Sequence, residues 1–141
     1  MKPLFIYGTL MTDQLRDWAF LPPSRWDRVP AKARGRLYSV GGHYPAMVED
    51  PDQWTVGEIV TPKGDFTQNH RFDLDGTVDM EVRAGYVLAE VPAILTDPHT
   101  HPSRMDVQAT AFVVPMHLIA RYQLDPIVSN DWREYERNLR K

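Results

Sequence analysis

The sequence predicts an α+β fold, in which a small mixed β-barrel or sheet carries one or two flanking helices. Short apolar runs rich in β-branched residues recur along the chain and read as strands. The 12 prolines lie mainly between these runs, so we expect many turns and few long helices. A chain of 141 residues is expected to form a single domain spanning residues 1–141, with a substantial core.

The first strand is predicted at Leu4–Tyr7, a continuous apolar run that ends at a glycine. A helix of two to three turns is predicted over residues 12–20 and stops before two consecutive prolines. Residues 31–40 alternate between small or apolar and polar side chains, which predicts another strand. Residues 41–45 then form a loop, in which His43 either is an ordinary turn residue or lines a pocket near the end of the first strand.

Three more strands are predicted in the rest of the chain, at Trp54–Thr61, Tyr86–Leu95 and Ala109–Val114. Gly57, inside the first of them, indicates a bulge or a close approach of another backbone. The segments 62–70 and 96–104 are polar or rich in turn residues, so we expect exposed connections there.

The last element is predicted to be a helix that starts near Asp131 and is capped by Ser129. Trp132, Tyr135 and Leu139 form its apolar stripe, which should pack on the outside of the sheet.

Composition excludes several classes of function. The net charge of −3 and the lack of a basic run give no reason to expect a nucleic-acid partner. The chain has no cysteine, which excludes disulfides and cysteine nucleophiles. No apolar stretch reaches the length of a signal-peptide core or a membrane span, so we expect no membrane partner and, by default, a cytoplasmic location. The sequence does not indicate an oligomeric state.

The string Phe72-Asp73-Leu74-Asp75-Gly76-Thr77-Val78 matches the nucleophile motif of haloacid-dehalogenase-type phosphatases. That motif must end the first strand of a doubly wound sheet, and only 64 residues follow Thr77 here. We therefore interpret it as a chance match in a solvated acidic turn, and keep the phosphatase as a distant alternative. Its glycine is also placed too early for a calcium loop.

The segment Asp97-Pro98-His99-Thr100-His101 carries two histidines that are close enough in sequence to bind a metal. Two histidines one residue apart in a proline-rich loop are more often solvated, so no metal site is predicted.

Three segments in order resemble the γ-glutamylcyclotransferase-like (AIG2-like) family. They are Phe5-Ile6-Tyr7-Gly8-Thr9-Leu10, the stretch from Gly35 to Ala46 with its Gly-Arg-Leu-Tyr and Gly-His-Tyr-Pro-Ala strings, and Val56-Gly57-Glu58-Ile59-Val60. A fourth segment, Val78-Asp79-Met80-Glu81-Val82 followed by Tyr86, resembles the acidic segment of the family less closely. Leu88 and Phe112 replace the arginine and tyrosine that are usual in the family.

The resemblance implies a barrel fold and an enzyme that converts a γ-glutamyl amine or peptide to pyroglutamate (5-oxoproline) and releases the amine. It implies Glu81 as general acid and base, in an environment with an apolar wall formed by Met80 and Val82. It also implies that no cofactor is needed, because the attacking amine and the γ-carbonyl belong to one molecule.

The residues expected to bind this small-molecule substrate are Tyr7, Gly8, Thr9, Leu10, Tyr44 and Tyr86. Gly8 would let backbone N–H groups approach the α-carboxylate of the substrate, and Thr9 would add a hydroxyl. The departures near Glu81 leave a second reading open, a protein of this fold that binds a small ligand or partner without catalysis.

Overall fold

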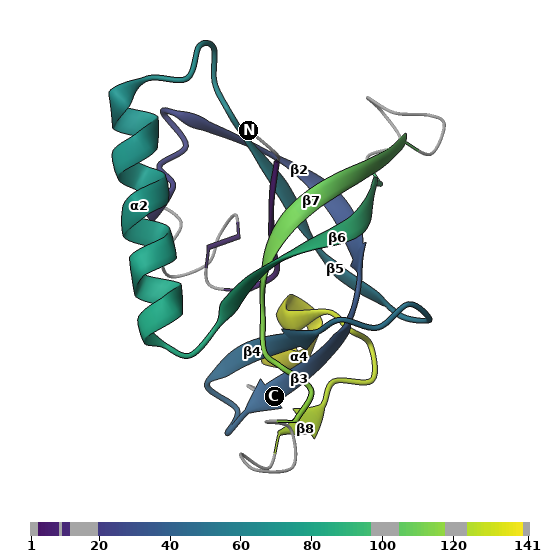
Figure 1. Ribbon diagram of the computed structural model, residues 1–141. Helices are drawn as coiled ribbons and strands as arrows, with labels where there is room; N and C mark the ends of the chain where they lie inside the picture. Colours follow the sequence, from purple (N-terminus) through teal and green to yellow (C-terminus); the bar gives the residue numbers. More distant parts are fainter. Residues whose placement is uncertain (1–2, 9, 12–19, 97–104, 118–123, 140–141) are drawn as a thin grey trace.

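A closed five-stranded barrel, a three-stranded sheet and two helices make up the part of the chain that the computed structural model describes, residues 3–8, 10–11, 20–96, 105–117 and 124–139 (Figure 1). Around the barrel the strands are β1 (Leu4–Ile6), β5 (Trp54–Pro62), β2 (Trp26–Arg34), β6 (Val87–Leu95) and β7 (Met105–Val113). The second sheet has the order β4 (Tyr44–Val48), β3 (Arg36–Val40) and β8 (Asp125–Pro126). The helices are α2 (Gln68–Arg83) and α4 (Trp132–Leu139). The predicted α+β class and mixed barrel are confirmed.

Strand β1 lies between two partners and has no exposed edge. It runs antiparallel to β5 and parallel to β7, with Leu4 opposite both Val60 and Thr110. All three of its residues are buried. The predicted first strand at Leu4–Tyr7 is confirmed, although it ends at Ile6 and Tyr7 follows it.

The ring of Phe5 is fully buried in the barrel, among several buried alanines of neighbouring strands. Gly57 of β5 faces it: a Cβ atom there would meet the carbonyl oxygen of Ile6 and lie 2.6 Å from the Phe5 ring. The close backbone approach predicted at Gly57 is confirmed. The surrounding alanines, all buried, are Ala31, Ala33, Ala93, Ala109 and Ala111.

We expect Gly57→Ala to destabilise the fold by about 1–3 kcal/mol or more, because the new methyl group overpacks a site bounded by backbone and a ring. Gly76→Ala is the control, since Gly76 lies in α2 and a Cβ there meets nothing within 4 Å. Alanine at that helical position should stabilise by about 0.5–1 kcal/mol. Urea denaturation measures both variants, and a Gly57→Ala protein as stable as the parent would refute the close-packing argument.

The predicted strand over residues 31–40 is divided into two strands that belong to different sheets. Gly35 lies at the break, where a Cβ would lie 2.7 Å from the Met47 side chain. On β3 the predicted alternation holds, with Leu37 and Ser39 buried and Arg36 exposed. The predicted loop is shorter than expected, because β4 already begins at Tyr44.

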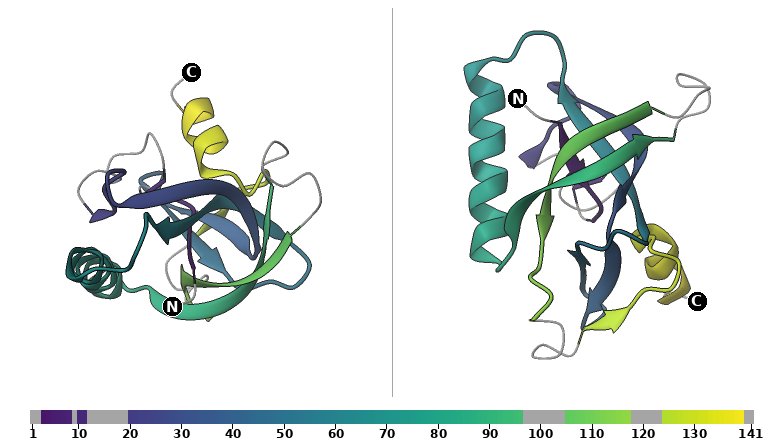
Figure 2. Two further views of the ribbon diagram at one scale, coloured as in Figure 1. Left: turned by 90° about the horizontal axis from the view of Figure 1, so that it is seen from above. Right: turned by 45° about the vertical axis from the view of Figure 1, so that its right-hand side comes forward.

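Helix α2 was not predicted, and the acidic string that resembles a phosphatase motif lies inside it instead of in a turn. Thr67 caps the helix, and its side chain and that of His70 form a reciprocal capping box. Only His70 and Thr77 of the helix are buried, so no apolar stripe marks it in the sequence. Figures 1 and 2 show α2 standing along one side of the barrel. The sheet is not doubly wound and the string does not end a strand, which excludes the phosphatase reading.

Helix α4 starts at Trp132, close to the predicted position, and packs beside the small sheet (Figure 1). The Asp131 carboxylate accepts hydrogen bonds from the backbone N–H groups of Arg133 and Glu134, at 3.0 and 3.4 Å, so it caps the helix together with Ser129. Trp132 is buried and the Tyr135 hydroxyl donates to Ser39 Oγ at 3.1 Å. Leu139, the third member of the predicted stripe, is about half exposed.

The predicted helix over residues 12–20 and the loop over 96–104 lie almost entirely outside the described residues.

Candidate active site

A cavity of about 230 Å³ opens beside the end of β1. Its walls come from four places in the chain: the segment after β1, the turn into β4, the C-terminal end of α2, and the facing ends of β6 and β7. The lining residues are Phe5, Ile6, Tyr7, Gly8, Leu10, His43, Tyr44, Pro45, Met80, Glu81, Ala84, Tyr86 and Phe112.

The predicted site residues meet in this cavity as far as they are described. Tyr7, Gly8 and Leu10 line one wall, and Tyr44, Tyr86 and Glu81 line the others. Thr9 lies outside the described residues. Their roles toward a ligand stay predictions.

Seven further lining residues are not among the predicted site residues, and two of them, Phe5 and Ile6, belong to β1. His43 was expected either in an ordinary turn or in a pocket, and Phe112 marks a departure from the family. Pro45 and Met80 are neighbours of predicted residues, so their position in the chain could have found them. No sequence pattern indicates Ala84, because it is placed at the cavity as the C-cap of α2, a helix that was not predicted.

Tyr7 connects three strands through its hydroxyl. The buried phenol donates to the carbonyl oxygen of Phe112 and accepts from the backbone N–H of Met47 at 3.2 Å. Burial, then the neighbouring Tyr86 and the negative charge of Glu81, raise the pKa of Tyr7 well above its usual value. Tyr7 therefore stays protonated at neutral pH and cannot serve as a general base there.

Tyr86 fixes the opposite wall in the same manner. Its hydroxyl donates to the carbonyl oxygen of Pro45 at 2.5 Å, and its backbone N–H donates to the carbonyl oxygen of Glu81 at 3.0 Å. The two tyrosines thus hold β4 and the end of α2 in place around the cavity.

Gly8 packs closely against the ring of Pro45. A Cβ atom at Gly8 would lie 2.7 Å from Cγ of Pro45 and 3.2 Å from its Cδ. Gly8 does not have a positive φ angle, so the need for glycine here is one of space. The turn that follows is closed by a hydrogen bond from the Met11 N–H to the Gly8 carbonyl oxygen at 3.0 Å.

Glu81 lies in the last turn of α2, a helix that was not predicted, and its side chain is half-buried. Met80 and Ala84 lie beside it in the cavity. The expected contribution of Val82 to an apolar wall is wrong, because Val82 is 53% exposed and does not line the cavity. Consecutive residues of a helix point about 100° apart, so Met80 and Val82, which flank Glu81, cannot both face the cavity.

A polar network ties the N-terminal half of α2 to β2 and so places the helix against the barrel. The Arg25 guanidinium donates to both carboxylate oxygens of Asp73 at 2.8 Å, and Trp26 Nε1 donates to one of them at 2.8 Å. His70 Nδ1 accepts from the Thr67 N–H at 2.9 Å, so the proton is on Nε2 and is donated to the Arg25 carbonyl oxygen at 2.8 Å. Asp73 is therefore a structural residue, whatever its motif resembles.

We expect Asp73→Asn to lower stability at pH 7 and to lose that effect in acid. Hydrogen bonds from Arg25 in the first place, and also from Trp26, lower the pKa of Asp73. A depressed folded-state pKa gives a contribution that is present above the unfolded value of about 3.9 and disappears as pH falls through the folded-state pKa. Urea midpoints of parent and variant should differ at pH 7 and converge as the pH falls below about 3.9 and through the folded-state pKa. Asp75→Asn, on an exposed position of the same helix, is the control, and an equal loss in both variants would contradict the assignment.

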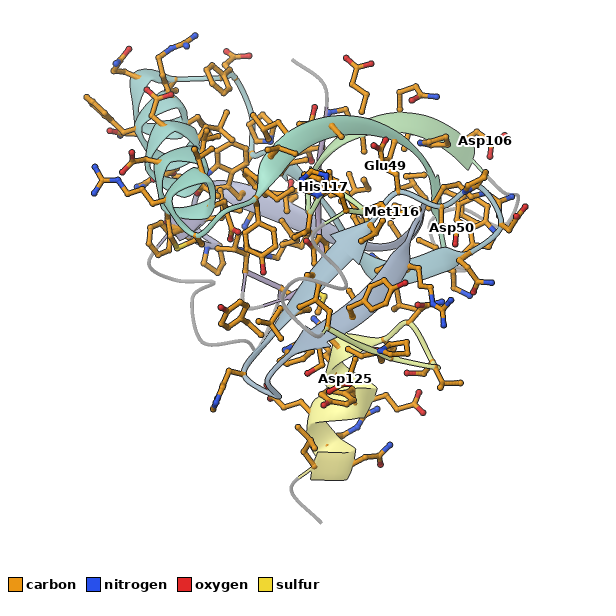
Figure 3. The ribbon with its side chains drawn as sticks, turned by 60° about the horizontal axis from the view of Figure 1, so that its bottom comes forward. Glu49, Asp50, Asp106, Met116, His117 and Asp125 are labelled. Carbon is orange, nitrogen blue, oxygen red and sulfur yellow. The ribbon has the colours of Figure 1, made fainter. Side chains whose placement is uncertain are left out.

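Within the described residues, no group of three or more histidine, aspartate or glutamate side chains is placed to bind a metal ion. Acidic side chains such as Asp106 and Asp125 lie well apart in the structure (Figure 3). The two histidines of the segment 97–101 lie outside the described residues. No helix in the described part of the chain is long and apolar enough to cross a membrane.

Comparison with protein families gives one match, over residues 4–134, to the family described as "Gamma-glutamyl cyclotransferase, AIG2-like". A search of curated proteins finds no match.

Solved structures with the same fold come from distant organisms. The chain is 15% identical to the uncharacterised protein PH0828 from Pyrococcus horikoshii, with a TM-score of 0.65 over 99% of this chain and 97% of that one. It is 18% identical to an AIG2-like protein (GGACT) from Mus musculus, with a TM-score of 0.59 over 81% and 77% of the two chains. With YkqA from Bacillus subtilis it shares 18% identity and a TM-score of 0.62 over 96% of this chain, which spans only 40% of the length of YkqA. At these identities the likeness shows the fold alone.

Proposed function

The chain belongs to the AIG2-like γ-glutamyl cyclotransferase family, and from this premise we propose that it cyclises the γ-glutamyl group of a γ-glutamyl amine or peptide to 5-oxoproline, with Glu81 as general acid and base. The observation that supports this proposal is that Glu81 lines the same cavity as the segment after β1. Those residues lie far apart in the chain, and only the fold brings them together.

The proposed reaction moves two protons from the α-ammonium nitrogen of the substrate to the leaving nitrogen. Glu81 removes the first of them, and the free amine attacks its own γ-carbonyl carbon. The bond from that carbon to the leaving nitrogen then breaks, and Glu81 returns its proton to the leaving nitrogen. The new ring nitrogen gives up the second proton, which the released amine takes up as an ammonium ion, so no oxidant, reductant or water is consumed.

The cavity favours this reaction in two ways. It is small enough, at about 230 Å³, to hold a γ-glutamyl group in the folded conformation that ring closure requires. Its apolar residues, among them Phe5, Met80 and Phe112, exclude water around the carboxyl group.

In this proposal backbone N–H groups of the segment after β1 hold the substrate α-carboxylate. The hydroxyls of Tyr7 and Tyr86 are already used to hold Phe112, Met47 and Pro45. The two tyrosines would therefore contact the substrate through their rings, and their hydroxyls would act by keeping the cavity in shape.

The test is release of 5-oxoproline from a panel of γ-glutamyl amines and γ-glutamyl dipeptides, followed by chromatography. Turnover of at least one compound is the expected result. Binding of a γ-glutamyl compound by calorimetry without turnover would favour the second reading, a non-catalytic protein that uses the same cavity. Absence of both turnover and binding across the panel would overturn the proposal.

A further inference from the structure

A second, larger hollow lies along α2 next to the proposed active site. It measures about 680 Å³ and is more open than the first. Its lining residues are Leu4, Pro62, Phe66, Arg71, Leu74, Asp75, Thr77, Val78, Leu88 and Thr110. The proposed reaction around Glu81 uses none of these residues.

The two hollows are consecutive sections of one trough between α2 and the barrel. On β7, Thr110 lines the second hollow and Phe112, two residues further on the same face of the sheet, lines the first. Leu4 of β1 lies opposite Thr110, and Leu88 of β6 lies opposite Phe112. Strands β1 and β7 therefore line both hollows, and Leu88 of β6 lies in the second hollow beside Phe112 of the first.

Helix α2 forms the other wall of the trough in the same order. The second hollow is lined by Leu74, Asp75, Thr77 and Val78 of this helix, and the first by Met80, Glu81 and the C-cap residue Ala84. With a rise of 1.5 Å per residue, the positions of Leu74 to Val78 lie about 5–10 Å from Glu81 along the helix axis. A substituent attached at the bond that breaks beside Glu81 would reach the second hollow within a few methylene groups.

The second hollow is mainly apolar. Leu4, Leu74, Val78 and Leu88 face it from the helix and the strands. Leu88 is 46% exposed, so an apolar surface remains open to solvent along the trough.

Two charged residues line this hollow, Arg71 at its far end and Asp75 on an exposed position of α2. Arg71 lies toward the N-terminal end of α2, with its guanidinium 5.6 Å from the centre of the Phe66 ring. The section next to the active site is therefore free of charged side chains among the described lining residues, apart from Asp75 on an exposed helix position.

We propose that this second hollow is the leaving-group subsite, and that it selects γ-glutamyl conjugates whose amine carries a linear apolar chain. The inference rests on the proposed function, because the leaving amine is defined by that reaction. The chain would lie along α2 between Val78 and Leu88, and the γ-glutamyl group would occupy the cavity around Glu81.

The experiment uses γ-glutamyl conjugates of primary n-alkylamines from ethyl to hexyl. These amines have nearly the same basicity, so the chemistry at the breaking bond stays constant while the chain grows. Burying one methylene group contributes about 0.8 kcal/mol, so kcat/KM should rise by up to about fourfold per methylene until the hollow is filled. A kcat/KM that does not change with chain length would overturn the proposal.

Two variants, each with a matched control, test whether the second hollow causes the dependence of kcat/KM on chain length. Val78→Trp fills the hollow from α2, and Leu88→Gln makes its floor polar; each should flatten the dependence of kcat/KM on chain length. The matched controls are Val82→Trp on the same helix and Val87→Gln on the same strand, both exposed positions outside either hollow. The controls should keep the parental dependence, and equal behaviour of variants and controls would contradict the subsite. Leu88→Gln at a half-exposed position keeps the test valid if Val78→Trp fails to fold.

Calorimetry on the same conjugates separates this proposal from the proposed function. If no conjugate is turned over but affinity rises with chain length and the rise is lost in Leu88→Gln, the subsite stands and the catalytic proposal fails. If conjugates are turned over but neither kcat/KM nor affinity depends on chain length, the catalytic proposal stands and the subsite fails. Absence of both binding and turnover rejects both.

Discussion

Replacing Glu81 by glutamine is expected to lower kcat for 5-oxoproline release by about 10²–10⁴-fold, the range typical of general acid–base catalysis. Glutamine keeps the shape and hydrogen-bonding capacity of the side chain but cannot carry the proton from the substrate amine to the leaving nitrogen. Affinity for a γ-glutamyl compound should change little, because the interaction that is lost acts in the transition state. Steady-state kinetics and calorimetry on the same compound measure the two quantities.

Asp79 supplies the matched control for this variant. It lies two residues before Glu81 on α2, is largely exposed, and pairs with Arg83 at 3.1 Å one turn away. Asp79→Asn should keep parental kcat, because such exposed pairs contribute little to the fold and Asp79 does not line the cavity. Full activity in Glu81→Gln together with a large loss in Asp79→Asn would mean that the general acid and base had been assigned to the wrong carboxylate.

The barrel could be predicted from the sequence because its strands have the simplest patterns. Leu4–Ile6 is buried on both sides and therefore reads as a continuous apolar run. Gly57 indicated a close approach because a glycine inside a strand usually marks a bulge or a place where another backbone comes near. The closure of the barrel and the pairing of β1 with β7 could not be predicted, since they depend on contacts between residues 106 positions apart, such as Leu4 and Thr110.

Helix α2 shows the limit of sequence patterns in this protein. A helix is recognised by an apolar stripe, and α2 buries a histidine and a threonine instead. Its attachment relies on the Asp73 carboxylate, Arg25 and Trp26, which come from segments that no local periodicity connects. Asp73 also belongs to the string that resembles a phosphatase motif. The two aspartates and the glycine of that string were interpreted as a turn.

The residues of the candidate site were predicted from the family resemblance. Their residue types and local patterns alone do not indicate a site. The spacing of Glu81 from Tyr86 supported the assignment, although the helix that carries Glu81 was not predicted. The structure adds the reason for that spacing: the Tyr86 N–H bonds to the Glu81 carbonyl oxygen and closes the end of the helix. A glutamate in the last helical turn and a tyrosine that enters the next strand are thereby brought to one cavity.

Gly8→Val is expected to lower kcat/KM for γ-glutamyl compounds by about 10²-fold or more while the protein still folds. A valine Cβ would lie 2.7 Å from Cγ of Pro45, so Pro45 and the start of β4 must shift. The Tyr86 hydroxyl donates to the Pro45 carbonyl oxygen, so the shift would also move a wall of the cavity. Displacements of about 1 Å at such a site can cost about 10²-fold in rate. Overpacking of this kind typically costs about 1–3 kcal/mol of stability, which urea denaturation would measure separately from activity.

The double variant Gly8→Val/Pro45→Ala separates two physical causes of that loss. Pro45→Ala removes the Cγ and Cδ atoms that a Cβ at Gly8 would strike. If the clash with Pro45 is the cause, the double variant should bind and turn over substrate better than Gly8→Val alone, because the two changes interact. If valine instead blocks the approach of the substrate carboxylate to the backbone after β1, Pro45→Ala should bring no recovery. Parental activity in Gly8→Val itself would exclude both causes, and with them the proposal that the segment after β1 holds the substrate.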